Sequence, residues 1–389
     1  MADSTIDRKP AIRFIVALGL ISLFADVTYE GARSILGPFL GTLGAGALVV
    51  GLVSGFGELA GYTLRLFSGY AADRTRSYWA LTISGYVTNM VAVPLLALAK
   101  VWPVAAALVV LERAGKAIRT PARDVMLSQA SKAVGRGWGF GLHEAMDQTG
   151  AFIGPLLVAA VLAETNAYGR AFTVLAIPAG LAIVTVLAAH RFYPHPSKFE
   201  QPSGQRISTK GLPRQFWMYV LAGALLAAGF VDFPLMAFHF QKQKLASQAA
   251  IPVIYAFAMG AEALTALIFG RLFDKIGVAA LIAGVVLSAA SSPLVFLGGL
   301  PMAIGGILLW GAGTGGQQSL LRAAIGDLVP VERRGAAYGI FNTAYGIAWF
   351  AGSAALGALY NVSFVALAAF AVISQTVAIP LLLMSRRHS

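Results

Sequence analysis

Long apolar segments recur along the whole chain, separated by shorter polar stretches. A helix needs about 20 apolar residues to cross the hydrocarbon core of a bilayer. The pattern predicts twelve such helices, at residues 11–35, 46–68, 78–99, 102–123, 138–162, 168–190, 216–240, 250–271, 278–299, 301–325, 336–360 and 362–384. We therefore expect an all-α integral membrane protein with twelve transmembrane helices.

Basic residues are concentrated on one side of this arrangement. If the N-terminus lies inside, the outer stretches hold only Lys100, Arg170, Lys242 and Lys244. Cytoplasmic loops of membrane proteins carry an excess of Lys and Arg. We therefore expect both termini in the cytosol, in a multi-pass protein of the bacterial inner membrane. The same distribution accounts for the net charge of +12 without a nucleic-acid partner.

Composition supports this class and removes several chemistries. Charged residues make up 12% of the chain, against about 25% in soluble domains. The absence of Cys excludes disulfides and thiolate metal sites. The sequence contains no phosphate-binding loop, nucleophile elbow or HExxH zinc motif. We expect no cofactor and no enzymatic activity.

The longest polar stretch, rich in Pro, Ser, Gly and Lys, follows the sixth predicted span and predicts a linker. It divides the chain into an N-terminal six-helix bundle at 1–190, a cytosolic linker at 191–215 and a C-terminal six-helix bundle at 216–389. The halves also resemble each other. Aligning Arg136 with Arg334 aligns Gly141 with Gly339 and Gly154 with Gly352, and spans one and seven each carry a central Asp, Asp26 and Asp232. Parallel halves of this kind, with a binding site between them, are typical of secondary transporters.

Three motifs resemble those of the major facilitator superfamily. The run GYAADR, with Gly69, Asp73 and Arg74, is similar to the loop motif of that superfamily, although Ala71 stands where Leu is usual. A partial copy holds Gly270 and Asp274. The run with Gly150, Gly154 and Pro155 is similar to the GxxxGP motif of the antiporter branch, which places an embedded Arg where Arg113 stands.

The resemblance implies a cytosolic gate. Asp73 would face the start of span eleven near Arg334, and Asp274 the start of span five near Arg136, because an acid is stabilised at the positive end of a helix. A solvated turn with orientation charges is the alternative reading of both loops.

Charged side chains inside spans cost about 2.5–3.5 kcal/mol each and usually face a cavity or a partner. The candidates for proton coupling or the substrate cavity are Asp26, Glu30, Arg33, Glu58, Arg113, Glu144, Asp147, Asp232 and Glu262. Seven are acids and two are arginines. We expect a cavity with an excess of acid, which favours protons and cationic or neutral substrates over anions.

Helical spacing divides these charges into smaller sets. Asp26 and Glu30 share one helix face, and Arg33 continues it, so Arg33 can neutralise Glu30. Asp26 would then lack a local partner and could take up and release a proton. Glu144 and Asp147 also share a face. Glu112 and Arg113 point in different directions, so Arg113 would pair with an acid of another span.

A soft-metal site is a weaker hypothesis. The thioethers of Met236 and Met259 and the imidazole of His239 are ligand types that suit Cu(I), but neither a Cys nor a His-rich loop supports them. We expect no resident metal.

Together these features predict a monomeric secondary transporter that works by alternating access. The leading hypothesis is proton-coupled efflux of a small organic compound, cationic or amphipathic, because the span-five motif resembles that of antiporters. The alternative is proton-coupled uptake of a nutrient or of a metal ion such as copper. A membrane receptor or scaffold is disfavoured, because buried acids would then be costly without a use.

Overall fold

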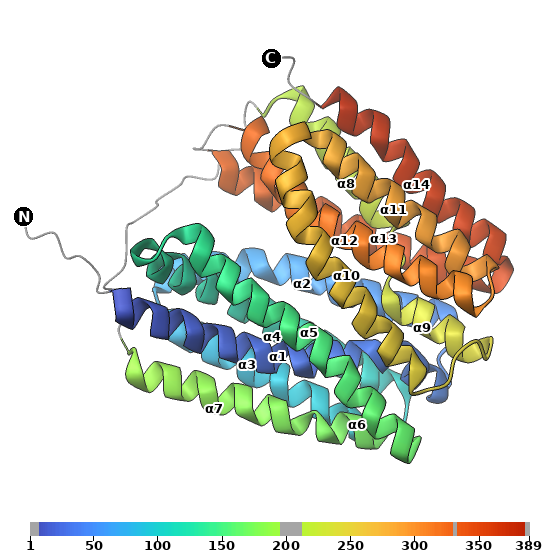
Figure 1. The fold of residues 1–389 in the computed structure, drawn as a ribbon, viewed down its shortest axis with the longest axis horizontal. Coiled ribbons are helices and arrows are strands. Elements are labelled where there is room, and N and C mark those ends of the chain that lie inside the picture. Colours follow the sequence, from blue (N-terminus) through green and yellow to red (C-terminus); the bar gives the residue numbers. More distant parts are fainter. Residues whose placement is uncertain (1–7, 195–211, 330–332, 386–389) are drawn as a thin grey trace, which may run out of the picture. The chain divides into compact units, whose positions relative to one another are not determined.

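The computed structural model describes residues 8–194, 212–329 and 333–385, and within these ranges every regular element is helical (Figure 1). The α-helices are α1 (Arg8–Thr42), α2 (Ala47–Thr75), α3 (Tyr78–Leu95), α4 (Trp102–Ala130), α5 (Arg136–Thr165), α6 (Tyr168–Val174), α7 (Ala176–Phe192), α8 (Arg214–Gly229), α9 (Phe233–Lys242), α10 (Ala250–Ile276), α11 (Val278–Leu297), α12 (Leu300–Leu328), α13 (Arg334–Val362) and α14 (Phe364–Met384).

These helices correspond to the twelve predicted spans, because α6 with α7 forms span six and α8 with α9 forms span seven. In the described ranges, nine spans are long and apolar enough to cross a membrane. Helix α4 falls short because it carries Glu112, Arg113, Lys116, Arg119 and Arg123. It also runs to Ala130, beyond the predicted end at 123. Its basic residues therefore lie well inside the helix and not at its end.

The chain forms two compact units, residues 1–33 with 63–203 and residues 34–62 with 204–389. The second unit includes the end of α1 and the start of α2. Gly37 of α1 lies directly on the carbonyl oxygen of Pro234 in α9, and Gly51 of α2 lies on that of Ser353 in α13. This division differs from the sequence-based boundaries in assigning 34–62 to the second unit. The predicted linker falls mostly in 195–211, outside the described residues.

Close helix contacts through glycine repeat in both units. In the first unit, a Cβ on Gly115 of α4 would lie 2.7 Å from the Gly85 carbonyl oxygen of α3. In the second, a Cβ on Gly313 of α12 would lie 2.8 Å from the Gly284 carbonyl oxygen of α11. Small residues let helix backbones approach closely inside a membrane. The two helix pairs are therefore packed in equivalent registers, as an internal repeat requires.

The same comparison corrects the proposed match between Asp26 and Asp232. Gly154 of α5 packs on the carbonyl oxygen of Val27 in α1, and its counterpart Gly352 of α13 packs on that of Ala228 in α8. In this register Val27 corresponds to Ala228, so the position equivalent to Asp26 is occupied by Ala227. Asp232 lies more than one helical turn further along.

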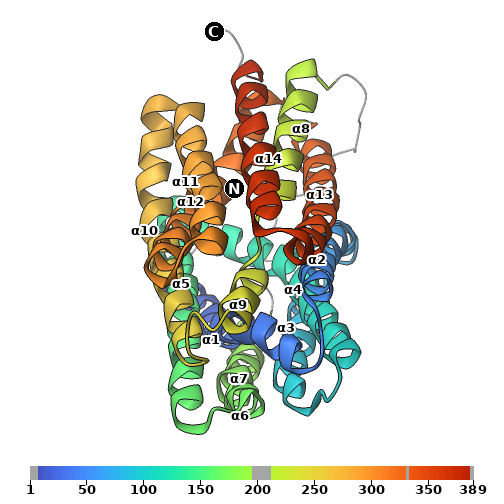
Figure 2. The ribbon, with the colours of Figure 1, turned by 90° about the vertical axis from the view of Figure 1, so that its right-hand side faces the viewer.

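Span seven is broken between α8 and α9 (Figure 2). A break exposes backbone groups that need hydrogen-bond partners in an apolar surrounding. The Trp310 indole nitrogen donates to the Val231 carbonyl oxygen at 2.9 Å, and the Gln375 amide donates to the Gly229 carbonyl oxygen at 3.0 Å. Asp232 begins α9, its carboxylate accepting from the Phe233 N–H at 3.0 Å. Side chains from α12 and α14 thus stabilise the break.

Candidate functional site

The first unit gathers buried charged side chains around Asp26, which is 6% exposed. The charges that act on its carboxyl are those of Asp147 from α5, Lys116 and Arg119 from α4, and Glu30 on its own helix. The carboxyl groups of Asp26 and Asp147 lie close enough to interact directly. Ionised carboxylates are acceptors only, so a hydrogen bond between them would need a proton on one of the two. The pair is a group that can hold and lose a proton.

Asp26 therefore has basic partners, contrary to the expectation from α1 alone. Lys116, Arg119 and Arg123 follow each other at spacings of three and four residues, which places them on one face of α4. That periodicity is the available signal for these three residues, and reading Arg119 and Arg123 as orientation charges at the cytosolic end of the span obscures it. The predicted acid excess is wrong for this unit.

Arg119 is 1% exposed and its guanidinium lies 4.2 Å from the centre of the Tyr86 ring. Its Nε and Nη1 have no hydrogen-bond acceptor among the described residues. The charge of Lys116 acts on the same Asp26 carboxyl as that of Arg119. The Lys116 Nζ lies 3.7 Å from the centre of the Tyr29 ring. Cation–π contacts of this kind stabilise a buried cation, but they leave hydrogen-bond donors unused.

Four further charges of this unit form two local ion pairs. Arg33 Nη1 lies 3.9 Å from Glu30 Oε2, which confirms the expected pair on α1. Arg123 Nη2 lies 2.8 Å from Asp124 Oδ1. Each of these pairs is neutral, so neither contributes net charge to the site.

Arg113 has a neighbour on its own helix that the sequence analysis did not expect. Its Nε lies 3.6 Å from Glu112 Oε2, and its guanidinium lies over the Tyr29 ring at 4.7 Å. Glu112 also accepts from the Asn89 amide at 2.6 Å, which ties α4 to α3. The prediction that Glu112 and Arg113 point apart is wrong.

Ser22 joins three helices one turn from Asp26. Its hydroxyl oxygen accepts from Arg123 Nη1 at 3.0 Å. It also lies 3.0 Å from His143 Nε2 and 3.3 Å from the Tyr86 hydroxyl. All three partners are within hydrogen-bond range, and His143 is buried and not at a helix end. The sequence analysis missed Ser22, because a lone Ser on an apolar helix carries no signal of its own.

Glu144 does not join its neighbour Asp147 in this group. The structure leaves Glu144 exposed, where its Oε1 accepts from the Gln148 amide at 3.1 Å on the same helix. Asp147 instead lies beside Asp26. The two acids predicted to act together are thus separated by their surroundings.

The second unit places its predicted residues in different settings. Asp232 is the N-cap of α9, while Glu58 on α2 and Glu262 on α10 are half-buried. His239 is packed among aromatic rings, its Nδ1 3.1 Å from the Tyr360 hydroxyl. Within the described ranges, no three His, Cys, Asp or Glu side chains are grouped so as to hold a metal ion. His239 is thus surrounded by rings, and the buried Met236 and Met259 stay weak metal candidates.

The antiporter-like motif has a physical role in helix packing. A Cβ on Gly150 or Gly154 would collide with the carbonyl oxygens of Leu23 and Val27 in α1. Gly31 of α1 faces the same contact, its Cβ position 3.1 Å from the Gly154 carbonyl oxygen. Pro155 continues α5. The motif brings α5 against α1 and so brings Asp147 to Asp26.

The gate motif is described only in part. Gly69 is half-buried, whereas Asp73 and Arg74 are exposed, and Arg74 donates to the Tyr70 hydroxyl at 3.2 Å. Gly270 has open space around it. The side chains of Arg136, Asp274 and Arg334 lie outside the described ones. Both predicted gate contacts therefore stay predictions.

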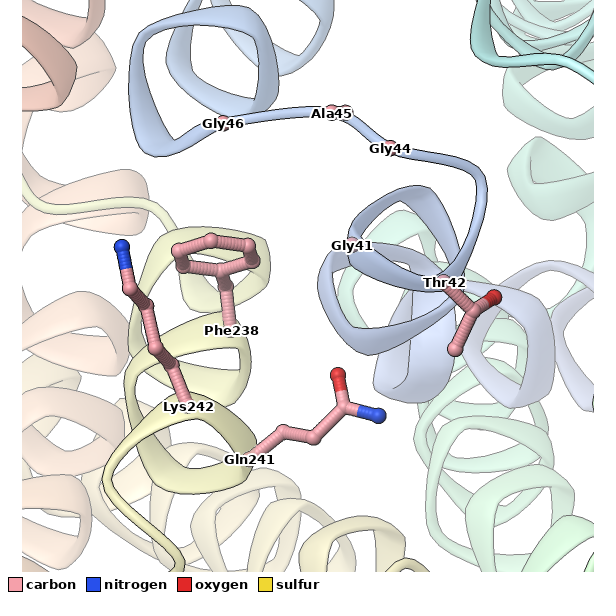
Figure 3. A pocket seen from close by; sticks show the side chains of 8 residues that line it. All are labelled: Gly41, Thr42, Gly44, Ala45, Gly46, Phe238, Gln241 and Lys242. Carbon is pink, nitrogen blue, oxygen red and sulfur yellow. The ribbon is translucent and has the colours of Figure 1, made fainter.

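A surface pocket of about 400 Å³ lies in the second unit, between the α1–α2 turn and the end of α9 (Figure 3). Gly41, Thr42, Gly44, Ala45 and Gly46 form one wall, and Phe238, Gln241 and Lys242 form the other. The Gln241 amide points toward the α1 end, and the Lys242 amine points away from it (Figure 3). This pocket has one charged side chain and contains none of the predicted site residues.

Comparison with known proteins places this geometry in a family. The Major Facilitator Superfamily model matches residues 18–353 and 220–389. An uncharacterized protein of Mycobacterium tuberculosis is 46% identical over 366 residues, covering 91% of this chain and 89% of the relative. An uncharacterized MFS-type transporter of Methanocaldococcus jannaschii is 27% identical over 373 residues, covering 90% and 89%.

Solved structures share the fold at low sequence identity. The nucleoside transporter NupG superposes with a TM-score of 0.81 at 14% identity, covering 95% of this chain and 99% of its own. At this identity the likeness concerns the fold alone. With the family match over most of the chain, it follows that the protein is a multi-pass membrane transporter and not an enzyme, and that it belongs to the major facilitator superfamily.

Proposed function

We propose that the protein is a proton-coupled secondary transporter in which Asp26 and Asp147 form the proton site. The observation that carries the proposal is the close approach of these two carboxyl groups, among buried and half-buried charged side chains. Such residues in membrane proteins commonly serve proton relays. Protons and one small-molecule substrate would be the transported partners.

The surroundings of the pair can couple a proton to a structural change. With one proton the two carboxyls hydrogen-bond to each other. Without it they repel and are attracted to Lys116 and Arg119, which belong to a different helix. Loss of the proton thus replaces an α1–α5 contact by contacts to α4. A change of partner between helices is the kind of step that alternating access requires.

The proposed membrane and orientation rest on the distribution of basic residues along the sequence. We place the protein in the bacterial inner membrane as a monomer surrounded by lipid, with both termini in the cytosol. The basic residues of the predicted inner stretches support this orientation. The loop motifs with Asp73 and Asp274 would close the cytosolic side, and two six-helix bundles would move against each other.

Two directions of coupling are candidate functions. Export of a small organic compound in exchange for protons is the first, supported by the likeness of the Gly150–Pro155 run to antiporters. Its glycines pack α5 against α1, a role that suits either direction. Uptake together with protons is the second, and the buried Arg119 and the half-buried Lys116 favour it for a nutrient over a metal ion. The acid excess that favoured a cationic cargo is absent from the first unit.

The test is proton flux in liposomes that hold the purified protein and a pH-sensitive dye. Compounds that raise the melting temperature of the detergent-solubilised protein are added from a panel of organic acids, amines and sugars. A stabilising compound should produce a proton flux in the wild type and none in Asp26→Asn. Glu164→Gln, an exposed acid on the same helix as Asp147, is the matched control and should behave as wild type. Equal fluxes in Asp26→Asn and wild type would refute proton coupling at this site.

A further inference from the structure

One buried base in the first unit, Arg119, has more hydrogen-bond donors than the described residues satisfy. Arg119 is 1% exposed, and its Nε and Nη1 lack an acceptor among the described residues. Lys116 acts on the same Asp26 carboxyl from the same helix face. Leaving buried donors of a charged group unsatisfied is destabilising, because the group loses its hydration without gaining a partner. A fold retains such an arrangement only where something else meets those donors.

Packing does not require these bases. The glycine contacts align α3–α4 with α11–α12, so Lys116 corresponds to Thr314 and Arg119 to Gln317. Thr314 donates to the Trp310 carbonyl oxygen at 2.7 Å, and Gln317 donates to the Gly284 carbonyl oxygen at 3.4 Å. Neutral residues therefore fill the same places in the second unit. The positive charges of the first unit serve a purpose other than holding α4 against α3.

The net charge of the site depends on whether Asp26 and Asp147 hold a proton. The local pairs Glu30–Arg33 and Arg123–Asp124 are neutral. Asp26 and Asp147 then stand against Lys116 and Arg119. With both acids ionised, two negative charges meet two positive ones. With one proton between the acids, one positive charge is left over, and a single bound anion restores neutrality.

We infer that the transported substrate is a small oxyanion, a carboxylate or a phosphate, held by Arg119 and Lys116 while Asp26 and Asp147 hold one proton. Guanidinium and ammonium groups are the usual partners of these anions. No covalent bond changes: a singly charged anion brings one negative charge, and the proton neutralises one carboxylate, so the site is neutral when both are bound. Proton and anion therefore bind together and move in one direction. The inference rests on the proposed function, which supplies the proton site.

The experiment measures binding and proton uptake together. Sodium benzoate, inorganic phosphate and tetraethylammonium are added to the detergent-solubilised protein at pH 6 and pH 8, and melting temperature and the pH of a weakly buffered solution are recorded. At least one of the anions should stabilise the protein more at pH 6, and its addition should make the solution more alkaline. The benzoate and phosphate arms separate the two oxyanion classes. Stabilisation by tetraethylammonium alone, or acidification on binding, would overturn the inference.

Several titratable groups near the acid pair could cause the pH dependence of anion binding, and variants distinguish them. The charged and titratable groups that face the pair are Glu30 from α1, Lys116, Arg119 and Arg123 from α4, and His143 from α5. Asp26→Asn should keep anion binding and lose its pH dependence. His143→Gln tests the other group that titrates in this range, and it should leave the pH dependence in place. A pH response that disappears only in His143→Gln would contradict the assignment.

Variants that copy the second unit separate binding from packing. Arg119→Gln and Lys116→Thr introduce residues that α12 carries at the same places, and each should lower anion affinity roughly ten- to hundredfold. Lys132→Gln, an exposed base just beyond α4, is the matched control and should bind as wild type. Unchanged affinity in Arg119→Gln, with an unchanged fold, would show a purely structural role and refute the inference.

The outcomes also separate this inference from the proposed function. If amines are the cargo and Asp26→Asn still abolishes proton flux, proton coupling stands and the oxyanion inference fails. If an anion binds through Arg119 without proton uptake, the oxyanion assignment stands and proton coupling fails.

Discussion

The indole nitrogen of Trp310 donates a hydrogen bond to the carbonyl oxygen of Val231, 2.9 Å away, at the point where α8 ends and α9 has not begun. A carbonyl released by a helix break has no water to bind in an apolar interior. The contact therefore allows span seven to be discontinuous.

Replacing Trp310 by Phe should lower the free energy of unfolding by about 1–3 kcal/mol, because the Val231 carbonyl loses its donor. Gln375→Met, which removes the donor to the Gly229 carbonyl, should act in the same direction. Unfolding by SDS in mixed micelles, followed by circular dichroism, measures both. Trp217→Phe on the exposed face of α8 serves as the control. A loss in Trp217→Phe as large as that in Trp310→Phe would contradict the role of the hydrogen bond.

Gly154 should tolerate no side chain. In Gly154→Ala the new Cβ meets the Val27 carbonyl oxygen, a backbone atom, and overpacking of this kind costs about 1–3 kcal/mol. Gly141→Ala on the same helix has open space and should be neutral or stabilising by up to about 1 kcal/mol. Thermal unfolding in detergent compares the two variants. Equal melting temperatures would show that α1 and α5 are not in close contact.

Gly352→Ala extends this test to the second unit. Its Cβ would collide with the Ala228 carbonyl oxygen, so the loss should match that of Gly154→Ala in sign and size. A tolerant Gly352 would argue against the equivalence of the two packing registers.

Asp232 should act as a helix cap. Asp232→Ala removes the acceptor of the Phe233 N–H and should cost about 1 kcal/mol of stability. Asp232→Asn keeps a capping oxygen but cannot release a proton, so stability and proton-driven transport should both stay near wild type. Transport that fails in Asp232→Asn while the protein stays folded would restore the proton-coupling role expected from the sequence.

Ser22→Ala should destabilise the first unit by about 1–3 kcal/mol, because Arg123, Tyr86 and His143 lose a shared partner. Ser84→Ala is the control, since Ser84 is exposed on α3 and bonds only to its own helix. The readout is the melting temperature of the two variants beside wild type. A Ser22→Ala protein as stable as Ser84→Ala would show that the three partners satisfy each other without the hydroxyl.

The sequence predicted the spans, the repeat and the pairing of Glu30 with Arg33, because each depends on local spacing. It did not predict the partners of Asp26. Those come from α4, whose charges lie near a helix end and look like orientation signals in a one-dimensional reading. Only the packing of α4 against α1 and α5 shows that Arg119 is buried and that Lys116 acts on Asp26.

The glycines also show what a sequence pattern cannot predict. Gly150 and Gly154 were visible as a motif, yet a motif does not say which backbone it touches. Knowing that Gly154 meets Val27 and Gly352 meets Ala228 fixed the register between the halves. In that register Asp26 does not match Asp232, although both residues lie near the centres of their predicted spans.

The hydroxyl of Ser22 has one hydrogen atom and two lone pairs, and Arg123 already occupies one lone pair. Of Tyr86 and His143, one must therefore donate to Ser22 while the other accepts from it. The hydrogen bonds of this network can therefore point in either of two directions. Switching it reverses the Tyr86 hydroxyl, the Ser22 hydroxyl and the protonated nitrogen of His143 together. One small side chain thus makes the hydrogen-bond directions of Tyr86 on α3 and His143 on α5 depend on each other.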